Sequence, residues 1–436
     1  MWSLCVFCGL ALSSAAHAET NASGGIVFTP YSDTTVSPRP AYEYFNPAFA
    51  YLPEQEEFDF GTRVPLGLAA LFAFPERNPV LYFTDRDLFD ERFDLLSFYD
   101  QLRYPASMLI NPGESPDEVI VRIGQDTISV TTGEGRPLYF DDVSGASGIS
   151  RPFSPLVPAP FLAYHHRWDN IYSVTGVFLA STGHSLRPND NLRDVLEGDP
   201  VEPDTRYEVT ASASAAAGVS QSLSYAVTAY GEYATVTVAP RVVGYYRFFT
   251  AEARIRAGSE TDQDNNPAGT DSRQSLFLSY PGNGWGSGSR LDLGTAFARE
   301  RFRAGISLLN IVGVDTVTGT ITSGDVTDEP ATITTVGPAP ATAVSASYHV
   351  PLETGALEFA ADALLSDSFS AHAGVSFFRG VFMFGLTGGY KGGFEGALTV
   401  GVRDGRRRAA LSLNAHQSPF VQDVVWGIGV YARVRR

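Results

Sequence analysis

The chain has very little cysteine and almost no lysine. Its two cysteines, Cys5 and Cys8, lie within the first eighteen residues, and Lys391 is the single lysine among 31 basic residues. Residues 4–12 form an apolar run, and Ala16-His17-Ala18 is a small-x-small cleavage pattern. We therefore expect residues 1–18 to be a secretory signal peptide that is removed. The mature chain would then hold no thiol, which excludes a disulfide framework and a cysteine–metal site.

Long apolar runs are also missing. No stretch of eighteen apolar residues follows the signal, and the longest candidate, 64–74, contains Gly67 and is too short to cross a bilayer as a helix. The net charge of −17 and the pI of about 4.8 argue against nucleic acid as a partner.

Catalytic and metal-binding motifs are absent from the sequence. It contains no GxSxG elbow, no HExxH helix and no P-loop. Asp262, Asp264 and Asn266 have the alternate spacing of a calcium loop, but Gly269 and Asp271 do not complete an EF-hand. We therefore predict a solvated acidic loop there, and a protein without enzymatic activity, metal or cofactor.

The positive signal is an alternation of apolar and polar residues that returns along the last two-thirds of the chain. Successive side chains of a strand point to opposite faces, so each such segment has one apolar and one polar face. About ten residues per segment, many times over, is typical of a transmembrane β-barrel. The apolar members of four such segments are Tyr207, Val209, Ala211 and Ala213; Phe302, Ala304, Ile306 and Leu308; Leu411, Leu413 and Ala415; and Trp426, Ile428, Val430 and Ala432.

We expect an all-β protein, an antiparallel transmembrane β-barrel of about fourteen strands. Residues 19–57 would form an N-terminal hatch or plug, and 58–436 the barrel, with a first strand at 58–72. Residues 84–104 have apolar positions at helical spacing, and 119–123 with 127–130 read as a hairpin. Residues 75–155 are therefore either an inserted subdomain or an ordinary pair of barrel strands with a long loop.

The strand and loop assignments do not fit together at one point. Separate strands are predicted at 206–217, 221–231, 233–241 and 246–257, and polar connections at 183–205, 258–272 and 311–341. With these strands, the three connections do not all fall at the same end of the barrel, although the long outer loops of such barrels do. One or more of the predicted strands must therefore be wrong.

The polar faces of the predicted strands carry both signs of charge. Opposite charges that face one lumen would pair into a network that fills or filters it. The alternative is a lumen packed with paired side chains for stability alone. The lumen-facing charged residues that we predict are Glu208, Glu252, Arg254, Arg256, Arg301, Arg303, Glu358, Asp362 and Arg403.

Two short motifs stand out in the sequence. The first is Asn46-Pro47-Ala48, just ahead of the first strand. It resembles the FadL-like family of outer-membrane channels for long-chain fatty acids and hydrocarbons, in which the tripeptide belongs to a hatch that plugs the barrel. The second is the stretch 291–297, with Asp292 and Gly294, followed by Leu308-Leu309-Asn310. It is similar to a strand pair of FadL-like barrels and of their TraF-type relatives in conjugal transfer.

The resemblance implies a barrel of the bacterial outer membrane that takes up a hydrophobic small molecule passively, with movement of the hatch opening the path. Its partners would be outer-membrane lipid, the barrel-assembly machinery and a hydrophobic ligand. A structural or secretion- or conjugation-accessory barrel with a filled lumen is the main alternative. An outer-membrane enzyme and a soluble periplasmic β-protein are two others.

Overall fold

The structure is a computed structural model of the chain. It describes residues 46–51, 58–63, 66, 70, 107–110, 119–123, 128–132, 162–197, 199–231, 234–323, 326–336, 340–365, 369–391, 393–404, 407–417 and 424–435. The predicted signal peptide at 1–18 and the amphipathic helix at 84–104 lie outside these residues. Among the described residues, no helix has the length and hydropathy that crossing a membrane requires.

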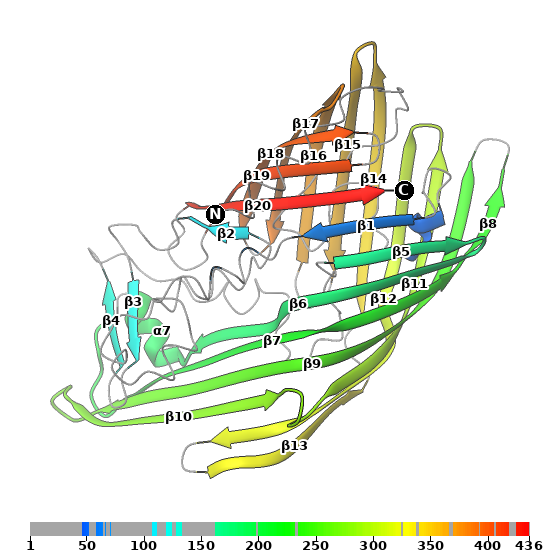
Figure 1. The fold of residues 1–436 in the computed structure, drawn as a ribbon. Coiled ribbons are helices and arrows are strands. Elements are labelled where there is room, and N and C mark those ends of the chain that lie inside the picture. Colours follow the sequence, from blue (N-terminus) through cyan, green and yellow to red (C-terminus); the bar gives the residue numbers. More distant parts are fainter. Residues whose placement is uncertain are drawn as a thin grey trace, which may run out of the picture.

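Strands dominate the described part of the chain (Figure 1). A 3-10 helix, η1 (Pro47–Tyr51), precedes them, and one α-helix, α7 (Asp190–Glu197), interrupts them. The strands are β1 (Phe58–Arg63), β2 (Ser107–Leu109), β3 (Val119–Ile123), β4 (Ile128–Thr132), β5 (Leu162–Trp168), β6 (Ile171–Pro188), β7 (Arg206–Tyr225), β8 (Val227–Tyr230), β9 (Thr235–Thr261), β10 (Pro267–Ser279), β11 (Gly286–Arg299), β12 (Phe302–Ser323), β13 (Val326–Val336), β14 (Ala341–Leu352), β15 (Gly355–Leu365), β16 (Phe369–Arg379), β17 (Phe382–Lys391), β18 (Phe394–Asp404), β19 (Arg407–Gln417) and β20 (Val424–Arg435).

The antiparallel pairings close into a ring. They run from β1 through β5, β6, β7, β9, β11 and β12, then through β14 to β20 in chain order, and β20 pairs with β1 again. The closing ladder sets Asp59 opposite Arg435 and Arg63 opposite Tyr431. A closed ring leaves no unpaired sheet edge, which a strand-built protein needs in order to stand in a bilayer.

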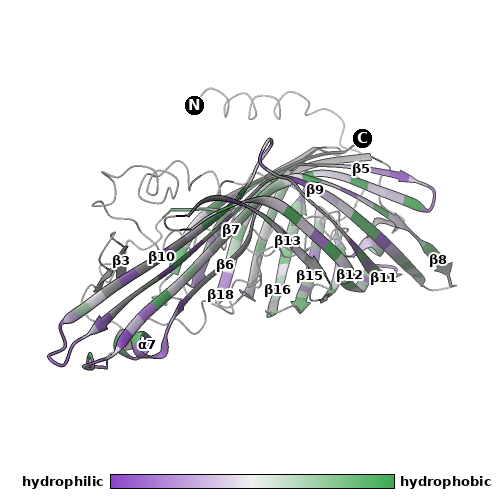
Figure 2. Ribbon diagram, turned by 90° about the horizontal axis from the view of Figure 1, so that it is seen from below, coloured by the Kyte–Doolittle hydropathy of each residue, from purple (hydrophilic) through white to green (hydrophobic). Residues whose placement is uncertain are grey.

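The wall has an apolar outer face and a polar inner face, and the predicted alternation is confirmed. On β19, Leu411 is 59% exposed whereas Ser412 and Asn414 are buried. On β12, Ile306 is 47% exposed and Ser307 is buried. Figure 2 shows apolar residues recurring between paler and polar ones along the strands. The all-β barrel fold of the outer-membrane type, predicted from this pattern, is therefore confirmed.

Exposed aromatic side chains mark both ends of the apolar outer face, as in other transmembrane barrels. Near one end lie Trp168, Tyr225, Phe302, Tyr348 and Phe382; near the other lie Tyr246, Tyr280, Trp285, Phe369, Tyr390, Phe394 and Trp426. Tyr246 of β9 and Trp285, which directly precedes β11, stack with their ring centroids 6.5 Å apart.

The predicted strands did not put the three polar connections at one end of the barrel because two long strands were each predicted as two. Segments 206–217 and 221–231 form one line, β7 and β8, and segments 233–241 and 246–257 form β9. In the same way β10 and β11 follow one edge of β9 in the same direction, and β13 and β14 follow one edge of β12. With these corrections, all three polar connections lie at the same end of the barrel, which we call the loop end.

The three connections are also shorter than predicted, because strands continue into them. They are 189–205, which contains α7, then 262–266 and 324–325. The opposite end, which we call the turn end, has only short connections, at 169–170, 231–234, 300–301, 353–354, 380–381 and 405–406. The start of β1 and the end of β20 also meet at the turn end, where Asp59 is opposite Arg435.

The first strand and the inserted region differ in part from the prediction. Strand β1 ends at Arg63 rather than at 72, and Leu66 and Ala70 are helical. Pro65, which has no N–H to donate to a ladder, explains the early end. The predicted hairpin is present as β3 and β4, with Val121 opposite Val130. It lies beside α7 in Figure 1.

Candidate functional site

The Asn46-Pro47-Ala48 segment lies against the inner face of the barrel wall, close to the turn end. The Asn46 side-chain amide donates to the Thr295 carbonyl on β11 at 2.8 Å. Its Oδ1 accepts from the Ala48 backbone N–H at 3.0 Å, and its backbone carbonyl accepts from the Phe49 N–H at 3.1 Å. One asparagine thus starts the short helix η1 and holds it to the wall.

Two glycines of the wall make room for this segment. A β-carbon on Gly294 would overlap Asn46 Oδ1 and lie 2.7 Å from Pro47 Cδ. A β-carbon on Gly305 of β12 would lie 2.5 Å from Asn46 Nδ2 and 2.7 Å from Phe49 Cζ. Real β-carbons do not come this close to other atoms, so the segment fits only because both wall residues lack a side chain.

Tyr51, the last residue of η1, forms a second attachment. Its hydroxyl donates to the Ser224 carbonyl on β7 at 2.6 Å and lies 3.1 Å from Ser224 Oγ. Its ring meets the Tyr172 ring edge-on at 6.2 Å, and the Arg167 guanidinium lies 5.5 Å from its centroid. The segment is therefore fixed at both ends, to β11 through Asn46 and to β5, β6 and β7 through Tyr51.

Between these attachments lies an apolar cluster on the inner face of the wall. Its buried members are Ala48, Phe49, Tyr51, Tyr172, Val174, Ala226, Ala239 and Ala296. Phe49 and Ala48 are at most 1% exposed. The cluster combines the N-terminal segment with β6, β9 and β11, so any displacement of η1 would uncover the apolar wall residues.

Asp292 and Asn310 build an irregularity in the wall next to this cluster. The β11–β12 ladder shifts register between Leu291 and Leu293, and Asn310 has a φ of +60°. The Asn310 backbone N–H donates to Asp292 Oδ1 at 2.7 Å, and both residues are fully buried. The sequence stretches that carried the second resemblance, 291–297 and 308–310, thus meet each other here, and Gly294 brings them to Asn46.

Asp292 also holds two buried arginines. Arg241 Nη2 lies 2.7 Å and Arg290 Nε 3.2 Å from Asp292 Oδ2. A separate buried pair joins Arg247 to Asp315 at 2.8 Å, with Arg247 over the Tyr245 ring at 5.2 Å. Buried charges are tolerated only when they are paired in this way.

A third buried cluster lies on the opposite wall and depends on a glycine. His372 of β16 contacts Asp362 of β15 through Nδ1, at 3.3 Å, and Glu395 of β18 through Nε2. Strand β17 separates β16 from β18, but its residue in this row is Gly389. A β-carbon on Gly389 would overlap the imidazole, so its absence lets His372 reach across.

The predicted lumen residues occupy different environments. Glu252, Glu358 and Asp362 are at most 6% exposed, and Glu208 and Arg303 are half-buried. Arg254 and Arg256 lie on the same face of β9 as Glu252, nearer the loop end, with side chains 57% and 53% exposed.

Two of the predicted residues need separate comment. Arg301 does not face the lumen from a strand, because it lies in the turn 300–301 and is exposed. Glu300, with a φ of 46°, ends β11 before it, so the predicted strand start at 301 was one residue too early. Arg403 lies on β18, and its side chain is outside the described part.

Several inner charged residues were not predicted: Arg241, Arg247, Arg290, Asp292, Asp315, His372 and Glu395. The β7–β9 register shifts at Phe248, so that β9 presents odd residues inward before it and even residues after it. If one alternation is assumed along 233–257, the residues on one side of Phe248 are therefore assigned to the wrong face. The sequence feature that could have revealed inner residues here was a charged residue in an otherwise apolar stretch, as at Arg241 and Arg247.

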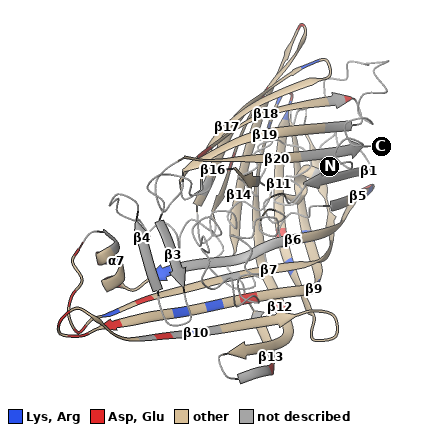
Figure 3. Ribbon diagram, turned by 60° about the vertical axis from the view of Figure 1, so that its left-hand side comes forward, with Lys and Arg blue, Asp and Glu red and all other residues tan. Residues whose placement is uncertain are grey.

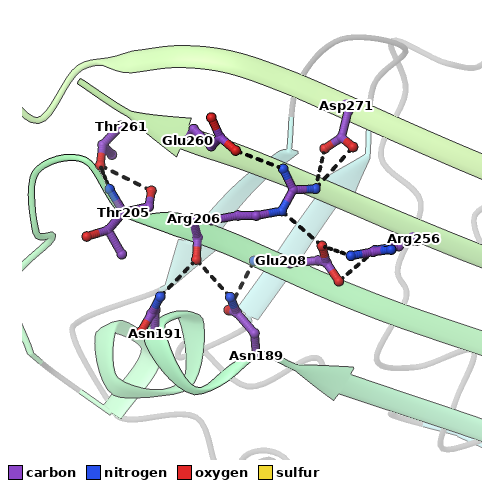
Figure 4. Close-up of polar contacts among 9 residues, drawn as sticks. All are labelled: Asn189, Asn191, Thr205, Arg206, Glu208, Arg256, Glu260, Thr261 and Asp271. Atoms are coloured by element: carbon purple, nitrogen blue, oxygen red, sulfur yellow. Dashed lines mark hydrogen bonds and ion pairs between the residues drawn. The ribbon is translucent and has the colours of Figure 1, made fainter.

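The loop end carries a network around Arg206 (Figure 4). Arg206 Nη2 lies 2.8 Å from Asp271, Nη1 3.1 Å from Glu260 and Nε 3.1 Å from Glu208. Arg256 Nε lies 2.7 Å from Glu208. The network joins β7, β9 and β10, and Figure 3 shows the charged residues along these strands.

The N-terminal end of α7 is attached to the part of β7 that carries Arg206 and Glu208. The Asn189 side chain accepts from the Leu192 N–H at 3.0 Å, as an N-cap does, and accepts from the Glu208 N–H at 3.1 Å. Its amide donates to the Arg206 carbonyl at 2.7 Å. The connection 189–205 is therefore tied to the strand that follows it.

The acidic turn 262–266 is organised by backbone hydrogen bonds. Asp262 Oδ1 accepts from the backbone N–H groups of Asn266, at 2.8 Å, and Asp264, at 2.9 Å. The N–H of Asn266 and then that of Asp264 lower the pKa of this carboxyl group. Within the described residues, no three His, Cys, Asp or Glu side chains are placed to hold a metal ion.

Comparison with known proteins finds similarity only among solved structures. No family model and no curated protein matches the chain. The P. putida toluene transporter TodX is similar at 10% identity with a TM-score of 0.34, over 63% of this chain and 81% of TodX. The CymD monoaromatic hydrocarbon channel gives 10% identity and a TM-score of 0.30, again over 63% of this chain and 81% of CymD.

A Rhodopseudomonas blastica porin variant is similar at 10% identity with a TM-score of 0.20, over 46% of this chain and 91% of the porin. TodX and CymD are hydrocarbon channels of the FadL family, the family that the sequence motifs resemble.

Proposed function

We propose that this protein is a channel of the bacterial outer membrane that admits a hydrophobic small molecule, and that the segment from Asn46 to Tyr51 is its hatch. The observation that carries the proposal is the apolar cluster that Phe49 and its neighbours in the docked segment form with the inner wall. A purely structural barrel can fill its lumen with paired polar groups, and gains nothing specific from an apolar patch beneath a docked terminal segment.

Placement in the membrane follows from the wall. The outer face carries exposed leucine, valine, isoleucine and phenylalanine between two levels of aromatic residues. In barrels of this kind, short turns face the periplasm and longer loops face outward. The hatch, which lies near the turn end, would then close the channel from the periplasmic side. A hydrophobic solute agrees with the similarity to TodX, a toluene transporter, and CymD, a monoaromatic hydrocarbon channel.

The hatch is built to be released rather than to be part of the wall. Its attachments are hydrogen bonds from Asn46 and Tyr51, together with packing of a few small or aromatic side chains. Displacement of η1 would leave Tyr172, Val174 and Ala296 facing the lumen, and these residues would offer an apolar surface to the passing solute.

Uptake by reconstituted protein tests the proposal. Vesicles that contain the protein should take up a monoaromatic hydrocarbon such as toluene faster than empty vesicles, and should not gain permeability to a sugar of similar size. Equal rates for the hydrocarbon in both vesicles, with a correctly assembled barrel, would contradict the proposal.

A further inference from the structure

Three arginines lie in one row across the inner wall at the loop end. Arg187 of β6 is opposite Thr210 of β7, Thr210 is opposite Arg256 of β9, and Arg256 is opposite Arg273 of β10. Residues that are directly opposite in an antiparallel sheet share a face. Arg254, two residues along β9 from Arg256, lies on the same face.

This face is the inner one. Ser224 of β7, which touches Tyr51 of the hatch, lies on the same side of β7 as Thr210, because β7 itself carries no extra residue between them. On β9, Thr250 and Glu252 continue the same side and are at most 4% exposed. Nearer the loop end, the side chains of Arg254 and Arg256 are more than half exposed, so a solute can reach them.

The carboxylates on this face are already paired with Arg206, Arg254 and Arg256. Glu252 pairs with Arg254, and Glu208 pairs with both Arg206 and Arg256. Glu260 and Asp271 both pair with Arg206 (Figure 4). In the described part of the chain, Arg187 and Arg273 make no ion pair, although both side chains are described and exposed.

The row therefore sets Arg273, which has no ion pair among the described residues, opposite Arg256, whose charge is partly offset by Glu208. Like charges directly opposite each other on neighbouring strands destabilise a sheet, and Arg256 and Arg273 are such a pair. This accumulation of positive charge occurs in a chain whose net charge is −17. A bound anion would relieve the repulsion between the two guanidinium groups.

The donors suit an oxyanion. A guanidinium presents N–H groups in a fork that matches two oxygens of a phosphate or carboxylate group, and remains charged at all working pH values. Hydroxyl donors stand in the same rows: Thr210 lies between Arg187 and Arg256, and Ser275 is opposite Arg254. Lipid headgroups would meet the outer face, so an inner site suits a soluble solute.

We propose that Arg187, Arg254, Arg256 and Arg273 form a binding site for a soluble oxyanion on the inner wall at the loop end. The site is separate from the hatch and goes beyond passage of a hydrophobic molecule. It would hold the acidic group of a solute above the channel. Since binding is measured directly on purified protein, the result does not depend on whether the channel carries a hydrocarbon.

Calorimetric titration of the purified barrel tests this site, with inorganic phosphate and with benzoate as separate probes at low ionic strength, where screening is weak. We expect saturable binding of at least one probe. The double variant Arg187→Gln/Arg273→Gln should bind about tenfold or more weakly, since hydrogen bonds to charged groups are lost. Neither arginine has an ion-pair partner among the described residues, so the double variant should still show the heat-dependent gel shift of a closed barrel.

Two further variants sharpen the result. Arg301→Gln removes the same charge at the turn end and should bind like the wild type. Arg273→Lys keeps the charge but loses the fork, and should bind with intermediate affinity. The proposal is overturned if the wild type binds neither probe, if the double variant binds like the wild type, or if Arg301→Gln weakens binding equally.

Discussion

Asn46 fills the space that a β-carbon on Gly294 would occupy. The relationship joins the two sequence motifs that pointed to a channel, one before the first strand and one in the middle of the barrel. A β-carbon on Gly305 would likewise come too close to Asn46 and Phe49, so the docking position is set by the lack of side chains at two wall residues.

Replacement of Gly294 by alanine should displace the segment from Asn46 to Tyr51 without breaking the barrel. The new methyl group would meet Asn46 and Pro47, whose segment is held by few hydrogen bonds and can move more easily than the wall. We expect higher solute permeability of reconstituted vesicles and an unchanged heat-dependent gel shift. Gly244→Ala is the matched control, because a β-carbon there meets nothing within 4 Å. Equal permeability of the two variants would refute the docking role of Gly294.

Asp292 should be essential for the stability of the wall near the segment from Asn46 to Tyr51. Asp292→Ala would leave Arg241 and Arg290 without their shared carboxylate and remove the acceptor of the Asn310 N–H. Breaking a buried ion pair by removing one partner costs roughly 3–5 kcal/mol. Urea unfolding in lipid vesicles should show a loss of this order. Asp271→Ala, which removes an exposed carboxylate, should change stability far less, and a similar loss in both would argue against the buried network.

His372 should stabilise the opposite wall only while its two carboxylates are present. His372→Ala leaves Asp362 and Glu395 buried without their shared partner, and we expect a loss of about 3–5 kcal/mol in unfolding free energy. Adding Asp362→Asn and Glu395→Gln to the same variant removes both charges and should recover much of the loss. A single variant as stable as the wild type would show that the cluster does not hold the strands together.

The outer face should reject charge where it meets lipid. Leu386 of β17 is 59% exposed between Phe382 and Tyr390, which mark the two ends of the apolar face. Leu386→Arg should cost roughly 2–4 kcal/mol if this position lies near the membrane midplane. Val201→Arg, an exposed apolar residue in the connection 189–205, should be almost neutral. The yield of folded barrel in lipid vesicles measures the effect of each substitution. Equal losses in the two variants would mean that the membrane does not contact Leu386.

The sequence was sufficient to predict features that depend on local pattern. Alternation predicted which residues of β12 and β19 face outward, since the period of a strand is two residues. The hairpin of β3 and β4 followed from two β-branched runs around a turn. The resemblance of Asn46-Pro47-Ala48 and Asp292 to known motifs identified two segments that the fold brings together.

Features that depend on register or on distant pairing could not be predicted. The extra residue at Phe248 reverses the inward parity of β9, so Arg241 and Arg254 appeared to lie on opposite faces. The contact of His372 with Glu395 requires Gly389 between them, and only the pairing of three strands reveals this alignment. The pairing of β7 and β8 with β9 was likewise needed to show that β7 and β8 form one line and that β9 is a single strand.

Deletion of residues 42–52 tests the central claim most directly. If the segment from Asn46 to Tyr51 is a hatch, reconstituted protein without it should form the same barrel and pass solute faster than the wild type. Permeability that stays at the wild-type level in a correctly assembled barrel would contradict the account, because the docked segment would then not control the path.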